Sequence, residues 1–171
     1  MNITLKPIDR SDTENILKWR NSEEVKKNFI YRKDLTEEEH NNWLETKVKT
    51  HLVYQFIITA DSKKIGSVYL QHIDKKNMKA EFGIFIGETL SQGKGYGKTA
   101  TELLLKFAFE KLKLNKVYLR VLAENERAIR CYEKSGFKTE GCFRQDEIID
   151  EKPYDIVFMG ILKSEWTERN E

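Results

Sequence analysis

The sequence predicts an α/β fold with a mixed, mostly antiparallel central sheet of about six or seven strands, flanked by helices. In the middle of the chain, three segments rich in β-branched and aromatic residues follow one another across short polar turns, which indicates an antiparallel meander. In the second half, strand and helix patterns alternate, which indicates crossover connections and parallel pairing. With 171 residues, two prolines and no repeats, the chain can build one core, so we expect a single domain over residues 1–171.

The chain begins with a strand pattern and a capped helix. Residues 3–8 alternate between apolar and polar side chains, as a short strand does. Ser11 is a suitable N-cap, and Glu14 three residues later completes a capping box. We therefore expect a helix that ends at Trp19 or Arg20.

A second helical region precedes the meander. Residues 23–28 form a short helical or irregular stretch, and Thr36 with Glu39 forms another capping box. The expected meander strands cover residues 53–59, 64–73 and 78–87. The segments expected after them are a helix over 99–113, a strand over 116–121, a helix capped by Asn125 and ended by Gly136, and strands over 136–143 and 154–162.

The composition excludes several classes of protein. The 30 basic and 28 acidic residues nearly cancel, which argues against a nucleic-acid partner because duplex binding needs a concentrated basic face. No apolar run has the length of a membrane span, and the N-terminus lacks the apolar core of a signal peptide, so we expect a cytoplasmic protein without a membrane partner. The scattered histidines and the two cysteines show no zinc spacing, so we expect no metal.

A glycine-rich basic turn, LSQGKGYGK, directly precedes the 99–113 helix. It is not a Walker A loop, because the required first glycine is replaced by Gln92. It is not a dinucleotide fingerprint either, because the third glycine after Gly93 and Gly95 is replaced by Lys98. Both motifs use the free backbone N–H groups at a helix start, and this turn retains that property. The sequence therefore predicts an anion site, most simply for a pyrophosphate.

Two motifs in this order resemble the GNAT superfamily of acetyl-CoA-dependent N-acetyltransferases. They are Gln92-x-x-Gly95-x-Gly97 between a strand and a helix, and Asn125-x-x-Ala128-x-x-x-Tyr132-x-x-x-Gly136-Phe137 about 30 residues later. The resemblance extends over residues 3–162. It implies an enzyme with acetyl-CoA (coenzyme A) as co-substrate and a small-molecule amine as acceptor.

The resemblance also implies which residues bind the cofactor. The amides of residues 93–98 correspond to those that hold the coenzyme A pyrophosphate, and strand residues 84–86 correspond to the backbone that meets the pantetheine arm. Lys94 and Lys98 fit either a phosphate contact or a solvated surface, and helix capping alone would account for Asn125. The implied cofactor residues are Ile84, Phe85, Ile86, Gln92, Gly93, Lys94, Gly95, Tyr96, Gly97, Lys98, Asn125 and Ala128.

Two residues are candidates for the chemistry of amine acetylation. Tyr132 lies where the family places the phenol that protonates the departing sulfur, although a tyrosine there also packs well in a core. Glu81 lies in the middle of a strand beside Gly83, and a carboxylate there is costly unless it is paired or wetted. We expect Glu81 to be the general base, with a structural hydrogen bond, or a water-mediated relay through other groups, as the alternatives. A backbone N–H near Phe85 or Ile86 would meet the oxyanion.

The N-terminal third resembles the subgroup that acetylates nucleotide-linked amino sugars. The run KWRNSEEV and the later segment EEEHNNW match its pattern. The resemblance implies Arg20, His40 and Trp43 as acceptor-binding residues, with a guanidinium for phosphate and an aromatic face for a base or sugar. The alternative is ordinary packing of Trp43 and a helix-end cation at Arg20.

The second half of the chain also resembles spermidine acetyltransferases and enzymes that acetylate ribosomal-protein N-termini. A polyamine or a peptide is therefore the alternative acceptor. An alternative of another class is a module that binds acetyl-CoA without transferring acetyl. The closing strand, 154–162, is expected at a sheet edge, where it offers an opportunity for pairing. A homodimer is implied by the resemblance alone.

Overall fold

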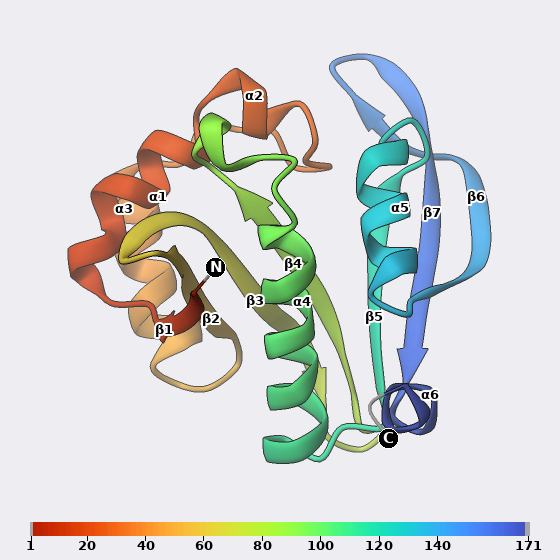
Figure 1. The fold of residues 1–171 in the computed structure, drawn as a ribbon. Helices are drawn as coiled ribbons and strands as arrows, with labels where there is room; N and C mark the ends of the chain where they lie inside the picture. The colour runs from red at the N-terminus through yellow and green to blue at the C-terminus, as the bar shows by residue number, and fades with distance from the viewer. Residues whose placement is uncertain (1, 170–171) are drawn as a thin grey trace.

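The computed structural model describes residues 2–169. Its centre is a seven-stranded sheet with the order β1-β2-β3-β4-β5-β7-β6, in which only β4 and β5 pair in parallel (Figure 1). The strands are β1 (Ile3–Pro7), β2 (Tyr54–Ala60), β3 (Lys63–Asp74), β4 (Lys79–Ile86), β5 (Lys116–Leu122), β6 (Lys138–Ile149) and β7 (Lys152–Leu162). The predicted fold class, including the β2-β3-β4 meander, is confirmed.

Helices cover both faces of this sheet. They are α1 (Thr13–Arg20), α2 (Glu23–Lys26), α3 (Glu37–Trp43), α4 (Tyr96–Lys106), α5 (Glu126–Lys134) and α6 (Lys163–Glu168). Helices α4 and α5 lie side by side over one face (Figure 1). Helices α1 and α3 pack on the other face, where Trp19 and Leu44 join the sheet residues Ile57 and Phe85 in a separate apolar cluster.

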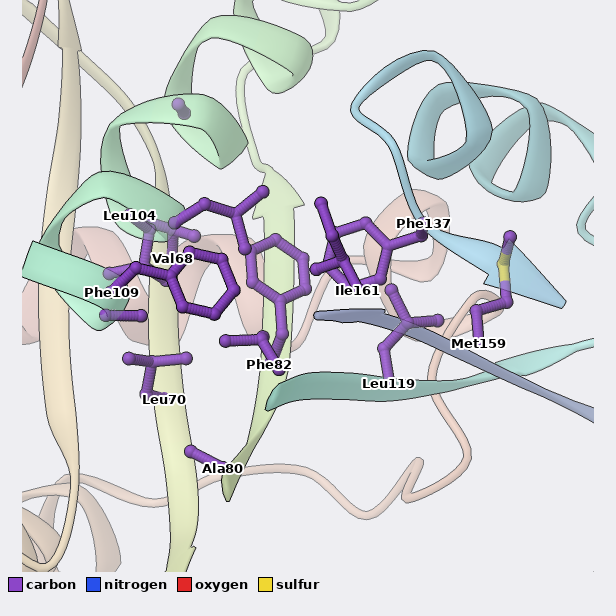
Figure 2. Close-up of a cluster of buried hydrophobic side chains, with 14 of the residues drawn as sticks. Val68, Leu70, Ala80, Phe82, Leu104, Phe109, Leu119, Phe137, Met159 and Ile161 are labelled. Atoms are coloured by element: carbon purple, nitrogen blue, oxygen red, sulfur yellow. The ribbon is translucent and has the colours of Figure 1, made fainter. Parts of the chain in front are cut away.

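The main core lies between the sheet and helices α4 and α5. Leu104 and Phe109 are fully buried against the sheet. Figure 2 shows the ring of Phe82 between these side chains and those of Leu119 and Ile161. Because β4 contributes Phe82 and Ala80 to this core, its alternate residues face α1 and α3. Strand β4 therefore presents a different set of side chains to each face.

Two of the expected helix caps are confirmed and one is wrong. The Thr36–Glu39 capping box is present, and the Asn125 side chain accepts the N–H of Ala128 at 3.2 Å. The Ser11–Glu14 box is absent. Asp9 and Asp12 form the box instead, around a 3₁₀ turn at residues 10–12. The Asp12 carboxylate accepts the backbone N–H of Asp9, and the Asp9 carboxylate accepts the backbone N–H of Asp12.

Two further differences concern which strand lies at the edge of the sheet and where a helix begins. The closing strand β7 is not an edge, because it pairs with β5 on one side and β6 on the other. The edges are β1 and β6, so these are the strands that a second copy could extend, and the homodimer itself stays a prediction. The glycine-turn helix begins at Tyr96 rather than at residue 99, so part of the turn is the helix's first turn.

Two features of the described residues bear on the expectation of no membrane partner and no metal. In residues 2–169, no helix is long and apolar enough to cross a bilayer. The same residues contain no group of three or more metal-ligating side chains.

We predict that Leu104→Ala destabilises the chain by about 3 kcal/mol, because Leu104 is fully buried and the substitution leaves a cavity in the main core. Leu90→Ala is the matched control, since Leu90 is 86% exposed. Urea unfolding followed by circular dichroism measures both changes. Equal effects of the two substitutions would contradict the assignment of the core.

Candidate active site

The site begins where β4 and β5 part. The two strands pair through only three residues each, from Lys79 opposite Lys116 to Glu81 opposite Tyr118. Beyond Glu81, β4 continues to Ile86 without a partner on that side among the described strands. A cavity of about 940 Å³ occupies the opening and is lined by residues of both strands and of the helices on both faces. A cavity of this size suits a large cofactor together with a small acceptor.

The glycine turn forms one end of the cavity. Gly93 and Gly95 have φ angles of +76° and +83°, a left-handed conformation that favours glycine. A Cβ at either position would meet no atom within 4 Å, so the backbone faces open space. Gly95 is the N-cap of α4, so the amides of Tyr96, Gly97 and Lys98 lie in the first turn and lack intrahelical partners. This arrangement fits the phosphates of coenzyme A.

Basic side chains surround this end of the cavity. Lys98 lines the cavity and pairs with Glu102 at 3.3 Å, whereas Lys94 does not line it. Three cations that sequence reasoning missed also line it: Arg127, Arg130 and Lys134. Positions 127, 130 and 134 lie on one face of the expected helix, and this shared face is the sequence signal that could have identified them. The residues from position 91 onward that line the cavity include no carboxylate, so this end attracts anions.

Gln92 and Asn125 hold the surrounding backbone. The Gln92 side chain donates to the carbonyl of Ile86 at 3.2 Å and accepts from Arg127 at 3.0 Å. It therefore ties the end of β4 to α5 across the glycine turn. Asn125 caps α5 beside Ala128, and both residues line the cavity. The structural role of Asn125 is thus present, and it does not exclude a cofactor contact.

Residues 84–86 of β4 line the cavity with a free backbone edge. On the other side they pair with β3, for example Phe85 with Ser67 and Ile84 with Val68. Toward β5, the described residues offer them no pairing strand. Unpaired N–H and C=O groups on this edge can pair with an extended ligand as a strand would.

Tyr132 reaches the cavity from α5. Its ring packs edge-on against Phe82 and Phe137, with centroids 5.9 and 6.0 Å apart. Burial raises the pKa of the Tyr132 phenol, with smaller contributions from Cys131 and Tyr69. The phenol therefore keeps its proton near neutral pH. Burial also raises the pKa of Cys131, which argues against a thiolate nucleophile.

Glu81 reaches the same cavity from the opposite face of β4. Its side chain is 8% exposed, and both oxygens are partnered: Oε1 accepts from Arg120 Nε at 3.2 Å and Oε2 lies 2.6 Å from His72 Nδ1. Only glycine fits at position 83, because the Tyr69 ring occupies the space that a Cβ would need. The prediction of a paired carboxylate in mid-strand agrees with this geometry, and the base role stays a prediction.

Arg20, His40 and Trp43 all line the cavity at the end formed by α1 and α3. The Arg20 guanidinium lies 3.7 Å from the centre of the Phe29 ring, and its Nη1 is buried without a hydrogen-bond partner among the described residues. Trp43 Nε1 donates to Gln55 at 2.9 Å. The structure thus brings together the three residues that were predicted from segments 20 positions apart.

His40 is buried and has one free nitrogen. Its Nδ1 lies 3.1 Å from Thr13 Oγ1, whereas Nε2 is buried and has no partner in the described part of the chain. Burial lowers the pKa of His40, against a smaller opposing effect of Asp12. His40 is therefore neutral near pH 7. A buried polar group without a partner is costly, so Nε2 and Arg20 Nη1 are groups that an acceptor or a water in the cavity can satisfy.

Comparisons with known proteins agree with this architecture. Residues 2–138 match the family model described as an acetyltransferase (GNAT) domain. Over 99% of its length the chain is 30% identical to the spermidine N(1)-acetyltransferase of Vibrio cholerae, of which it covers 98%. A crystal structure of the Vibrio cholerae spermidine N-acetyltransferase with coenzyme A and spermine superposes with a TM-score of 0.90, at 28% identity, covering 96% of this chain and 98% of that one. The chain is also 34% identical to a Bacillus subtilis protein assigned as a ribosomal N-acetyltransferase, over 62% of this chain and 57% of that protein.

The chain therefore belongs to the GNAT acetyltransferase family. It is an acetyl-CoA-dependent N-acetyltransferase, as the two sequence motifs predicted, with acetyl-CoA as co-substrate. The relatives favour the polyamine alternative over the nucleotide-linked amino sugar that the N-terminal third predicted.

Proposed function

We propose that the chain transfers acetyl from acetyl-CoA directly onto a primary amine, without a covalent enzyme intermediate. The observation that carries this proposal is the parting of β4 and β5, which opens one cavity to both faces of the sheet. The cofactor enters from the glycine turn, and the acceptor enters from the side of α1 and α3. Proximity in one cavity replaces the need for a nucleophilic side chain. The same sheet spans residues 3–162, which supports our proposal of one acetyltransferase domain over residues 1–171.

The backbone of the site would hold the cofactor. The amides of residues 93–98 and the α4 dipole would bind its pyrophosphate, and the free edge of residues 84–86 would pair with its pantetheine arm. When bound, acetyl-CoA supplies an activated acetyl thioester. The N–H of Phe85 or Ile86 would donate to the carbonyl oxygen of that thioester as negative charge develops there.

Two side chains would move the protons. Glu81 would accept a proton from the incoming ammonium group, since it lines the cavity as a paired carboxylate. Tyr132 would donate its proton where the sulfur departs, from the opposite face of the sheet. Because the two groups approach from different faces, they can serve the two ends of one reaction without neutralising each other.

We propose a polyamine as the acceptor. Support comes from the similarity to spermidine acetyltransferases over nearly the whole chain and from the charge of the cavity. All four carboxylates that line the cavity lie on segments before residue 82: Glu24, Asp34, Glu39 and Glu81. Three of them already pair with lysines, Glu24 with Lys27, Asp34 with Lys26 and Glu39 with Lys33. A cationic acceptor would replace these lysine partners.

A second candidate is an amine that carries an anionic or carbonyl group close by, such as a nucleotide-linked amino sugar. The observation that favours it is the buried, unpartnered Nη1 of Arg20. The protonated nitrogens of a polyamine are donors only and cannot satisfy this group, whereas a phosphate or a carbonyl can. Neutral His40 Nε2 suits either acceptor, because its tautomer decides whether it accepts or donates.

We predict that Gly95→Asp weakens coenzyme A binding about 100-fold, because it adds strain at a positive φ and a negative charge beside the phosphates. Isothermal titration calorimetry measures the affinity. Gly141→Asp is the matched control, since Gly141 also faces open space but has an ordinary φ. An unchanged affinity in folded Gly95→Asp would contradict the placement of the pyrophosphate.

We predict that Tyr132→Phe lowers kcat about 100-fold, with the KM for acetyl-CoA nearly unchanged, because the ring stays packed while the proton donor is lost. Steady-state thiol release from acetyl-CoA measures both constants. Tyr154→Phe, outside the cavity, serves as the control. A wild-type kcat in Tyr132→Phe would remove this phenol from the mechanism.

We predict that wild-type chain acetylates spermidine in a panel that also contains a UDP-linked 4-amino sugar and a ribosomal-protein N-terminal peptide. With spermidine, Arg20→Gln should leave KM unchanged or lower it, because it removes a positive charge from the acceptor end. Mass detection of the acetylated products identifies the acceptor. Turnover confined to the amino sugar, with its KM raised about tenfold by Arg20→Gln, would favour the second candidate instead.

A further inference from the structure

A β-bulge in β3 lies directly opposite the Glu81 segment. Gln71 pairs with Glu81 and Asp74 pairs with Lys79, so two residues of β3, His72 and Ile73, face the single residue of β4 between them. His72 has a φ of +49°, which is uncommon for a residue other than glycine. A conformation of this kind costs free energy and persists only where the surroundings enforce it.

The bulge changes the direction of the His72 side chain. In a regular strand, His72 would point to the face of Leu70, which belongs to the main core. Instead its ring meets Glu81, with Nδ1 2.6 Å from Oε2. Bulges commonly redirect a side chain next to an active site.

His72 connects Glu81 to the solvent. Glu81 lines the cavity with a side chain that is only 8% exposed, whereas the His72 side chain is 63% exposed. His72 itself does not line the cavity. The pair therefore forms a two-residue path from the buried carboxylate to the surface.

The overall reaction has a proton to release. A primary amine enters as an ammonium ion near neutral pH, and its acetylation with acetyl-CoA gives an amide, a thiol and one proton. In our proposed function, the group that takes this proton from the acceptor is Glu81. If Glu81 kept that proton, it would have to return it through the filled cavity before the next turnover.

We propose that His72 acts through Glu81, without touching the substrate, and carries this proton from Glu81 to the solvent. This inference rests on the proposed function. An N–H bond of the ammonium group breaks and an O–H bond forms on Glu81. While Glu81 is a carboxylate, the Nδ1–H of His72 donates to Oε2. Once Oε2 carries the substrate proton, the exposed imidazole gives its Nδ1 proton to water and takes one from water at Nε2. Nδ1 then accepts the proton of Oε2, and the Nε2–H bond breaks and gives its proton to water or buffer, which restores the starting tautomer. The carboxylate is restored, and one proton has moved from substrate to solvent.

The neighbouring charges allow this path. Arg120 on β5 donates to Oε1 at 3.2 Å and leaves Oε2 to His72. Arg120 also pairs with Glu147 of β6 at 3.3 Å, so its charge is shared between two carboxylates. Tyr118 is the register partner of Glu81 on the neighbouring strand β5, and Asp74 lies on the same strand as His72. The contacts with Arg120 and His72 hold the Glu81 carboxylate in one orientation, with its second oxygen toward the imidazole.

The test compares His72→Gln with wild type at saturating acetyl-CoA and acceptor. Glutamine can keep a hydrogen bond to Glu81 but cannot take up and release a proton. We expect kcat to fall about tenfold in weak buffer, a smaller loss than the 100-fold or more expected on losing the base itself. The KM values should change little. Added imidazole should restore most of the lost kcat, because the site of His72 is open to solvent.

Two controls separate this inference from the proposed function. His51→Gln should retain wild-type kcat with or without imidazole, since His51 stacks on Tyr54 away from the cavity. Glu81→Gln should lose activity that imidazole does not restore. Wild-type kcat and pH profile in His72→Gln, or a loss that imidazole leaves unchanged, would overturn the relay while the base role stands. Full activity in Glu81→Gln, or no turnover of any amine by wild type, would overturn the proposed function and the relay together.

Discussion

The site depends on the early end of pairing between β4 and β5. A parallel pair that continued to Ile86 would satisfy the backbone of β4 and close the sheet. Here pairing stops after Glu81, so the next residues of β4 keep an unpaired edge, and the sheet is open at the place where both faces carry functional side chains. The glycine turn, Tyr132 and Glu81 lie far apart in the sequence, and this opening is what places them around one cavity.

The rest of the fold keeps that opening in place. On one side, Phe82 of β4 is held in the main core with Leu104 and Leu119. On the other side, Phe85 packs edge-on with Trp19 and Phe29, at centroid distances of 6.4 and 5.7 Å. The side chain of Gln92 adds a tie from Ile86 to the glycine turn. An unpaired strand segment would otherwise be mobile, so this double packing is what makes its free edge a fixed binding surface.

Much of this arrangement could be predicted from the sequence because it follows from local chemistry. The meander follows from β-branched runs and short turns, and the glycine turn with its free helix-start amides follows from Gly93 and Gly95 before an apolar helix. The cap at the first helix was wrong because several acidic and hydroxyl side chains compete there, and the choice between Ser11 and its neighbours depends on the backbone path. The edge position of β7 was wrong for a different reason: strand order is a tertiary property, and no local pattern states that β6 lies outside β7. The bulge at His72 also escaped prediction, since the sequence around it reads as a regular strand.

The two halves of the chain carry different information about the reaction. The second half builds the glycine turn, α5 and the basic end of the cavity. Sequence similarity to other proteins in this half therefore indicates mainly that coenzyme A is used. The acceptor end is built from α1, the segment after α2, and α3, and its buried polar groups record which acceptor fits. The Nη1 of Arg20, buried on Phe29 without a partner among residues 2–169, suits an acceptor that brings an oxygen to it. The similarity to polyamine acetyltransferases and the chemistry of Arg20 therefore favour different acceptors. The similarity extends over nearly the whole chain, whereas acceptor choice depends on the few residues at this end of the cavity, so those residues decide between the two.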